Sequence, residues 1–254
     1  LFGAKIIPNR GVWLEFETGS DGFIGVKIDR RRKVAVTDLL RIFGWQSETG
    51  VSDFAAVDTG TIKYLAATLK KDTAKNLDDS YLEVYRRIRP GDLASLENMK
   101  SLIDAMFQRP DRYDLSLVGR FKMNQRLGRG KKKVSDSRLL TLEDLVGIVR
   151  EIIRLNNNEI AEPDDIDHLG NRRVRPVGEL VQSRLRIGLQ RMRRIIQDRM
   201  STLDINILTP VQLANARPLI SVVRDFFVSS QLSQFMDQVN PLAEVEHKRR
   251  ISAM

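Results

Sequence analysis

Apolar and polar residues alternate in two short stretches near the start of the chain. In VWLEFE (residues 12–17) and again in IGVKI (24–28), apolar side chains occupy every second position. The residues between them, TGSDG (18–22), have the composition of a tight turn. The pattern predicts an antiparallel β-hairpin, followed by a basic cluster (30–33) that is more typical of a solvated strand end than of a binding site.

Helical spacing dominates from residue 36 to about residue 155. Thr37 or Asp38 is placed to cap the helix containing LLRIFGW, and Asp78 or Asp79 to cap YLEVYRRI. Short polar side chains at these positions accept hydrogen bonds from the free N–H groups of the first turn. Most of this region is therefore predicted to be helical.

Three segments follow within the same region. DLASLENMKSLIDAMF (92–107) has helical spacing and stops before Pro110. The basic, glycine-containing GRFKMNQRLGRGKKK (119–133) predicts an exposed loop. Periodicity returns after it, where Thr141 and Asp144 have the spacing of a helix capping box.

The remaining sequence contains a long basic amphipathic helix at residues 177–200. Its apolar face comprises Val181, Leu185, Met192 and Ile196. Its other faces carry Arg184, Arg191, Arg194 and Arg199. Such a helix either lies along DNA or packs onto its own domain. A further helix is predicted at 217–227, and Pro241 is expected to end the periodic pattern.

Composition changes this picture mainly through charge. Apolar residues make up 42% and charged residues 30% of the 254 residues, which is typical of a soluble folded protein. Lys and Arg number 42 against 33 Asp and Glu, so the net charge is +9. This excess favours a polyanionic partner, although a basic protein that binds no polyanion has the same composition.

Several classes of protein are excluded or disfavoured. No apolar run is long enough to span a bilayer, and no signal-peptide pattern opens the chain. The absence of cysteine excludes disulfides and thiolate metal sites, and it favours the cytoplasm. Because the chain starts at Leu1 and stops at Met254, we expect a fragment of a longer protein.

The stretch DDIDHLGNRRVR (164–175) combines carboxylates with arginines. Asp164, Asp165 and Asp167 could hold Mg²⁺, which proteins often bind through one or two carboxylates. A cap or turn after Pro163 explains the same residues. His168 has no Cys or His partner at ligand spacing, which argues against zinc.

The arginines of this stretch carry a second hypothesis. Arg172, Arg173 and Arg175 could grip phosphates or base edges, and a nearby aspartate could hold a guanidinium or accept a hydrogen bond from a base. An intramolecular ion-paired turn fits equally well. The polar tail 229–252 could likewise line a ligand cavity or a nucleic-acid channel, or form a solvated helix and loop; nothing around it resembles a hydrolase triad.

Several motifs together resemble the beta subunit of bacterial multi-subunit DNA-directed RNA polymerase. The resemblance covers almost the whole chain and is weakest at about residues 46–82. The motifs are AKIIPNRGVWLEFE (4–17), KIDRRRK (27–33), RRIRPGD (86–92), RYDLSLVGRFKMNQRLG (112–128), DDIDHLGNRRVRPVGEL (164–180), NARPLISVVRDFF (215–227) and FFVSSQLSQFMDQVNPLAEVEHKRRIS (226–252).

The resemblance implies an α+β fold with a mainly helical lobe domain, which carries the N-terminal antiparallel β-hairpin, followed by a helical protrusion segment. The implied domains are the lobe (beta2) at 1–165, the C-terminal part of the protrusion (beta1) at 166–225, and the start of the fork region with the rifamycin-site motif at 226–254.

It also implies two sets of binding residues. Those expected to contact DNA, by receiving a guanine of the non-template strand near the downstream duplex, are Lys5, Ile166, Asp167, Leu169 and Arg172. Lys5 stands where arginine is common in the family, which keeps the charge and loses a bidentate fork. Those expected to contact rifamycin are Gln231, Gln234, Phe235, Asp237, His247, Arg250 and Ser252.

The implied activity is that of a nucleotidyltransferase complex. The family's catalytic Mg²⁺ is held by the beta-prime subunit, so we expect no catalytic residue, metal or cofactor in this chain, and no activity from the chain alone. The implied partners are DNA, nascent RNA, the beta-prime and alpha subunits, sigma factor, accessory transcription factors and rifamycins, with no membrane and a nucleoid-associated cytoplasmic location. A free-standing basic nucleic-acid-binding protein and a metal-dependent nuclease or phosphotransferase are the alternatives.

Overall fold

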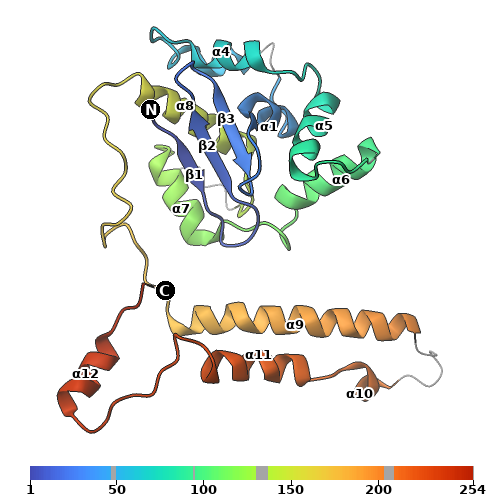
Figure 1. The fold of residues 1–254 in the computed structure, drawn as a ribbon, viewed down its shortest axis with the longest axis vertical. Coiled ribbons are helices and arrows are strands. Elements are labelled where there is room, and N and C mark those ends of the chain that lie inside the picture. Colours follow the sequence, from blue (N-terminus) through green and yellow to red (C-terminus); the bar gives the residue numbers. More distant parts are fainter. Residues whose placement is uncertain (47–49, 94, 130–136, 203–208, 254) are drawn as a thin grey trace. The chain divides into compact units, whose positions relative to one another are not determined.

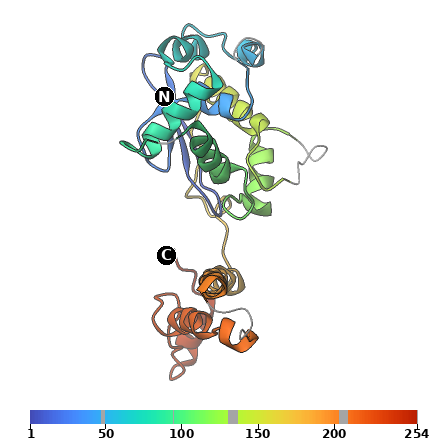
Figure 2. The same cartoon turned by 90° about the vertical axis from the view of Figure 1, so that its right-hand side faces the viewer.

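The computed structural model describes residues 1–46, 50–93, 95–129, 137–202 and 209–253. The chain forms two compact units, Leu1–Pro163 and Asp164–Met254. The first contains a sheet with surrounding helices, and the second is helical (Figures 1 and 2). The α+β class is therefore confirmed. Each unit is described by itself.

The first unit contains a four-stranded antiparallel sheet in the order β1-β2-β3-β4. Its strands are β1 (Ala4–Ile6), β2 (Leu14–Thr18), β3 (Ile24–Ile28) and β4 (Val34–Ala35). The predicted hairpin is β2–β3, in which Leu14 pairs with Ile28 and Thr18 with Ile24. Its turn is closed by the Gly19 N–H, which donates to the Phe23 carbonyl at 2.8 Å.

Strands β1 and β4 were not predicted from the alternation of apolar and polar residues. They have three and two residues, too few for a period of two to be recognised in the sequence. Both are held by ladder hydrogen bonds to a longer neighbour, β1 to β2 and β4 to β3. Tertiary pairing, not local pattern, makes them strands.

Seven helices of the first unit lie among the described residues. They are α1 (Val36–Ile42), α3 (Ser52–Ala55), α4 (Tyr64–Lys71), α5 (Leu77–Ile88), α6 (Leu96–Phe107), α7 (Ser116–Arg126) and α8 (Leu142–Asn156). Helices α1 and α4 pack on strands β3 and β4, α5 packs on α1 and β4, and α6 packs on α5. Leu14 and Val26 of the sheet, Leu39 of α1 and Val149 of α8 are fully buried in one core. Burying each such side chain contributes roughly 1.5–3 kcal/mol.

The helix caps are partly those expected. The capping box at α8 is confirmed: Thr141 accepts from the Asp144 N–H, and Asp144 accepts from the Thr141 N–H. The other two predictions were wrong. Thr37 and Asp38 lie inside α1 and are buried, and Asp78 and Asp79 lie in the first turn of α5. In both cases the helix starts earlier than its polar residues suggested.

The exposed loop predicted for residues 119–133 is largely a helix. Helix α7 extends to Arg126, and both Arg120 and Asn124 are buried. The Arg120 guanidinium donates to both carboxylate oxygens of Asp144 at 2.8 Å. Basic residues in a sequence indicate solvation, but the charge of Arg120 is neutralised by a buried partner. Residues 130–133 of the same prediction lie outside the described residues.

The second unit is built on a helical hairpin. Its helices are α9 (Val177–Thr202), α10 (Pro210–Leu213), α11 (Arg217–Val228) and α12 (Pro241–Arg249). Helix α11 lies alongside α9 (Figure 1), and a Cβ on Gly188 would lie 3.3 Å from Leu219 Cα, so this glycine permits the close approach. The long basic helix is confirmed. Pro241 starts α12 rather than ending a helix, as proline favours the first helical turn.

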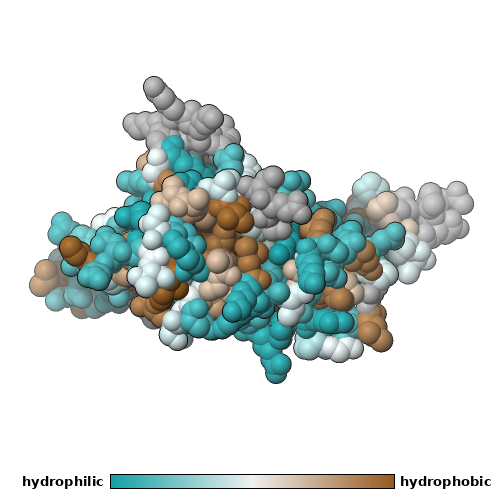
Figure 3. Space-filling model, turned by 90° about the horizontal axis from the view of Figure 1, so that it is seen from above, coloured by the Kyte–Doolittle hydropathy of each residue, from teal (hydrophilic) through white to brown (hydrophobic). Residues whose placement is uncertain are grey.

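Both polar and apolar side chains are exposed at the surface. The face shown in Figure 3 is mostly hydrophilic, with apolar side chains between the polar ones. Within the described ranges, no helix has both the length and the apolar character that crossing a bilayer requires.

Candidate nucleic-acid interface

The acidic and basic stretch 164–175 forms an exposed turn organised by Asp165. The Oδ1 atom of Asp165 accepts hydrogen bonds from the N–H groups of Asp167 (3.2 Å) and His168 (3.1 Å). Its carbonyl accepts from the Asn171 side chain at 2.7 Å. Asp165 thus has a structural role, since its carboxylate is engaged by the backbone.

The three arginines of this turn differ in their partners. Arg173 donates twice to the Glu179 carboxylate, at 2.6 and 2.7 Å, and Arg175 lies 3.6 Å from the same carboxylate. Both are thereby held on the first turn of α9. These contacts raise the pKa of Arg173 through the hydrogen bond to Glu179 and lower the pKa of Glu179. Arg172 has a long contact of 3.4 Å with Asp167, and both side chains are exposed. Arg172 is consequently the arginine of the turn that is least committed to the protein itself.

Four of the five expected DNA-contacting residues lie in this turn. Ile166 and Leu169 are exposed apolar side chains beside Asp167 and Arg172. Lys5 belongs to the other unit, on β1, where its Nζ lies 2.8 Å from Glu15 Oε1 and 5.5 Å from the Trp13 ring centroid. The turn thus presents an arginine, a carboxylate and two apolar groups to solvent together.

The possible metal ligands do not converge. Within the described part of the chain, no three His, Asp or Glu side chains are grouped as a cation site requires. Asp165 directs its carboxylate to N–H groups, and Asp167 faces Arg172. The turn provides hydrogen-bonding groups for a base more readily than ligands for Mg²⁺.

The expected rifamycin-contacting residues lie in the tail and in α12. Gln234 and Arg250 are brought together: Arg250 Nη1 donates to Gln234 Oε1 at 3.3 Å, and Gln234 Nε2 donates to the Gln231 carbonyl. Asp237 accepts from the Val239 N–H at 3.1 Å. Of the others, Phe235 is fully exposed, His247 lies within α12, and Ser252 follows that helix. The structure therefore brings the side chains of Gln234 and Arg250 into direct contact.

A hollow between α5 and α6 was not anticipated as a site. It has a volume of about 500 Å³ and a mostly polar lining that includes Arg89, Arg109 and Arg112. Asp92 is the acidic residue of its lining, and the Tyr85 hydroxyl donates to it at 2.7 Å. Arg89 and Arg112 fall in the motifs RRIRPGD and RYDLS, but their joint position depends on how α5 and α6 pack. The surplus of positive charge suits a phosphate.

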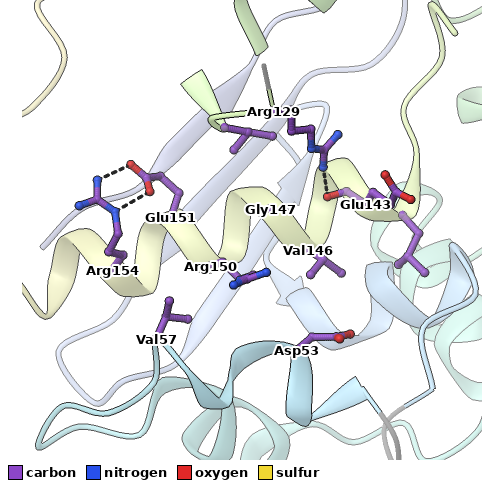
Figure 4. Close-up of a pocket in the computed structure, with 11 residues that line it drawn as sticks. Asp53, Val57, Arg129, Glu143, Val146, Gly147, Arg150, Glu151 and Arg154 are labelled. Carbon is purple, nitrogen blue, oxygen red and sulfur yellow. Dashed lines mark hydrogen bonds and ion pairs between the residues drawn. The ribbon is translucent and has the colours of Figure 1, made fainter. Parts of the chain in front are cut away.

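A second hollow, of about 540 Å³, differs in charge (Figure 4). Its arginines are balanced by acids, since Arg154 forms two hydrogen bonds of 2.7 Å with Glu151, and Arg129 donates to Asp144 and to the Glu143 carbonyl. Figure 4 shows the contacts of Arg154 with Glu151 and of Arg129 with Glu143 along α8, with Arg150 between them. Its lining has as many acids as arginines, which makes it a poor site for a polyanion.

Comparison with protein-family models shows the class of protein to which the chain belongs. Residues 3–175 match the family model described as RNA polymerase Rpb2, domain 2, so the class is RNA polymerase. The matched range contains the sheet, the seven helices described for the first unit and the turn that carries Arg172.

Similar proteins of known name show which RNA polymerase subunit the chain resembles. The chain is 47% identical over 253 residues to the DNA-directed RNA polymerase subunit beta of Dehalococcoides mccartyi, covering 98% of this chain and 20% of that protein. It is 47% identical to the same subunit of Syntrophomonas wolfei and 43% identical to that of Streptomyces avermitilis, covering 100% of this chain and 22% of each. The chain belongs to the family of bacterial DNA-directed RNA polymerase beta subunits. It spans about a fifth of the length of these relatives.

Proposed function

We propose that this chain forms part of the wall of the DNA cleft in a bacterial RNA polymerase, and so takes part in DNA-templated RNA synthesis. The observation that carries the proposal is the 164–175 turn. Its Arg173 and Arg175 are held by Glu179, while Arg172 and Asp167 are exposed and only loosely paired. A loosely paired arginine beside a carboxylate is suited to the edge of an unpaired base.

The base we propose is a guanine of the non-template strand. Arginine can donate to guanine O6 and N7 through its two-pronged guanidinium, and a carboxylate can accept from the guanine amino group. Ile166 and Leu169 would cover the base with apolar surface, and Lys5 would add attraction for phosphate. The 3.4 Å contact between Arg172 and Asp167 is long enough for either group to exchange its partner for the base.

The remaining parts of the proposal concern domains and partners. We assign residues 1–165 to the lobe, 166–225 to the C-terminal part of the protrusion, and 226–254 to the start of the fork region. In the assembled enzyme the chain would meet beta-prime, alpha, sigma and accessory factors, and DNA binding would hold the assembly at the nucleoid. The chemistry would belong to Mg²⁺ on beta-prime, so this chain by itself would not polymerise nucleotides.

We further propose that the tail contributes to a rifamycin site. The contacting groups are Gln231, Gln234, Phe235, Asp237, His247, Arg250 and Ser252. The contact between Gln234 and Arg250 supports this assignment, because it brings two of these residues together across sixteen positions of sequence. The exposed ring of Phe235 offers apolar surface beside them.

The test of the base pocket uses the assembled polymerase with Arg172→Ala. We expect the preference for guanine at the non-template position to fall about 5- to 150-fold, because a bidentate contact contributes about 1–3 kcal/mol of discrimination. RNA synthesis should continue. The measurement is the stability of open complexes on templates that differ only at that base.

Two matched variants sharpen this test. Arg172→Lys retains the charge without the fork, so it should lose guanine preference while keeping most of the general DNA affinity. Arg173→Ala removes an equal charge from the neighbouring residue, which is held by Glu179, and should leave the preference unchanged. An unaltered preference in Arg172→Ala would show that the pocket is wrongly assigned.

A further inference from the structure

A buried charged cluster joins α1 to the segment after α4 and to α5. The side chains of Asp38 and Asp72 are each 2% exposed, and that of Arg41 is 9% exposed. Arg41 Nη1 donates to Asp72 Oδ2 at 2.7 Å, whereas it lies 3.5 Å from Asp38 Oδ1. Two carboxylates therefore share one guanidinium inside the first unit, and Asp38 has the weaker contact.

The charge of Asp72 is well compensated. Besides Arg41, the Thr37 hydroxyl donates to its Oδ2 atom, and the Ala74 N–H donates to its Oδ1 atom at 2.9 Å. Three donors thus engage this one buried carboxylate. The cluster then contains one guanidinium already committed to Asp72, and little is left to balance a second negative charge.

The neighbours of Asp38 favour its neutral form. The Ser80 hydroxyl has other partners besides Asp38: it donates to the Asn76 carbonyl at 3.2 Å and accepts from Arg41 Nη1 at 3.4 Å. Burial raises the pKa of Asp38 to about 7, and the negative charges of Asp72 and, more weakly, Glu83 act in the same direction. The hydrogen bond with Ser80 and the charge of Arg41 oppose this rise without cancelling it.

We propose that Asp38, Arg41 and Asp72 form a proton-dependent clamp that holds the segment after α4 and helix α5 against α1. The clamp is tight while Asp38 carries a proton. It is weakened when Asp38 loses the proton, because two negative charges then face each other around one guanidinium. Helix α5 lies beside α1 (Figure 1) and also carries Arg89 at its C-terminal end, so the clamp supports the element that lines the arginine hollow.

The direction of the pH dependence follows from proton binding. The folded protein keeps a proton on Asp38 up to about pH 7, whereas the ordinary pKa of an aspartate in an unfolded chain is near 3.8. Between these two values the folded state binds one proton more, so its stability from this group decreases as pH rises. Above about pH 7 the loss is complete and the contribution becomes constant.

The experiment is urea unfolding of the 254-residue chain at pH 5.5 and pH 8.0, followed by tryptophan fluorescence. Trp13 and Trp45 are the two tryptophans and both lie in the first unit, so the signal reports that unit. We expect the unfolding equilibrium constant of the wild type to rise roughly ten- to thirtyfold more between these pH values than that of Asp38→Asn. Asparagine imitates the protonated acid in shape and charge.

Two further variants complete the test. Asp53→Asn, at an exposed position on α3, should keep the pH dependence of the wild type. Asp72→Asn removes the neighbouring negative charge and should move the midpoint of the stability change to lower pH. The clamp is refuted by an Asp38→Asn chain that retains the wild-type pH dependence, by one that does not fold at pH 8.0, or by an unmoved midpoint in Asp72→Asn.

Discussion

Arg120 and Arg172 show how differently one residue type is used in this chain. The Arg120 side chain is 2% exposed and is bound by a carboxylate, Asp144, that is fully buried. Arg172 lies in a solvated turn with one long contact. A buried guanidinium with a matched carboxylate holds α7 on α8, whereas an exposed one remains available for a ligand. At the residue scale, solvation separates structural arginines from those proposed to bind DNA.

Asp144→Asn should strongly destabilise the first unit. Burial raises the pKa of Asp144, but the hydrogen bonds from Arg120 and the Thr141 N–H outweigh it and hold the pKa below its usual value. Stability from Asp144 is therefore present above about pH 4 and decreases as pH falls through the lowered folded pKa. Removing one partner of a buried pair costs about 3–5 kcal/mol.

Urea unfolding at pH 7, followed by tryptophan fluorescence, measures this loss. Asp111→Asn is the control, because Asp111 pairs with Arg109 on the surface, where such pairs contribute about 0–1 kcal/mol. Equal losses in the two variants would contradict the structural role given to Asp144.

Some helices and strands of this chain form where the spacing of their own residues predicts them. The β2–β3 hairpin, the capping box of α8 and the apolar stripe of α9 agree with the spacing of their residues. Helix α7 does not, because its basic residues resemble a loop until Arg120 meets Asp144, 24 positions away. Short strands β1 and β4 likewise depend on their neighbours. The same holds for the candidate sites. The motif in the sequence identified the turn that carries Arg172, whereas only the packing of the helices brought Arg89 and Arg112 to one hollow.

Gly188→Val should loosen the contact between α9 and α11. An added Cβ would lie 3.2 Å from Leu219 Cδ1 and 3.3 Å from its Cα, so larger side chains force the helices apart. Such overpacking typically costs about 1–3 kcal/mol. Hydrogen exchange of peptides from α9 and α11 should show reduced protection.

Gly178→Val provides the matched control. It lies in the same helix, and a Cβ there would meet no atom within 4 Å. It should therefore leave protection unchanged or slightly increased, since valine favours the helix more than glycine does. Similar protection in the two variants would show that close approach at Gly188 is unimportant.

At the scale of the whole molecule, net charge is the property most relevant to nucleic acid. The excess of nine positive charges is unevenly distributed. The hollow lined by Arg89, Arg109 and Arg112 has a single acidic residue in its lining, whereas the lining of the hollow along α8 has equal numbers of acids and arginines. Attraction to phosphates depends on such local surpluses rather than on the total.

The 254-residue chain should bind duplex DNA weakly and with strong salt dependence. Each phosphate contact releases counterions and contributes about −0.9 to the slope of log K against log salt concentration. Fluorescence anisotropy with a labelled duplex at 50–200 mM salt measures this slope. Replacing both Arg89 and Arg112 by alanine should reduce the magnitude of this slope by the contribution of one to two phosphate contacts, about 0.9 for each.

Arg150→Ala is the control for this experiment, because Arg150 lies in the balanced hollow, and it should change the slope less. Identical slopes in all variants would exclude the arginine hollow as a phosphate contact. Tight, sequence-specific binding by the chain would instead favour a free-standing DNA-binding protein.

Sequence by itself determined the hairpin, the long basic helix and the capping box, since each depends on residue types at short and regular spacing. It also contained the motifs of the polymerase family, and the resemblance that they carry implied the α+β class. Only the tertiary structure decided which charges are buried. Asp38 looked like a helix cap and is part of an internal cluster, and Arg120 looked solvated and is enclosed. Burial of a charge depends on partners from distant segments, and no local pattern records where those partners will lie.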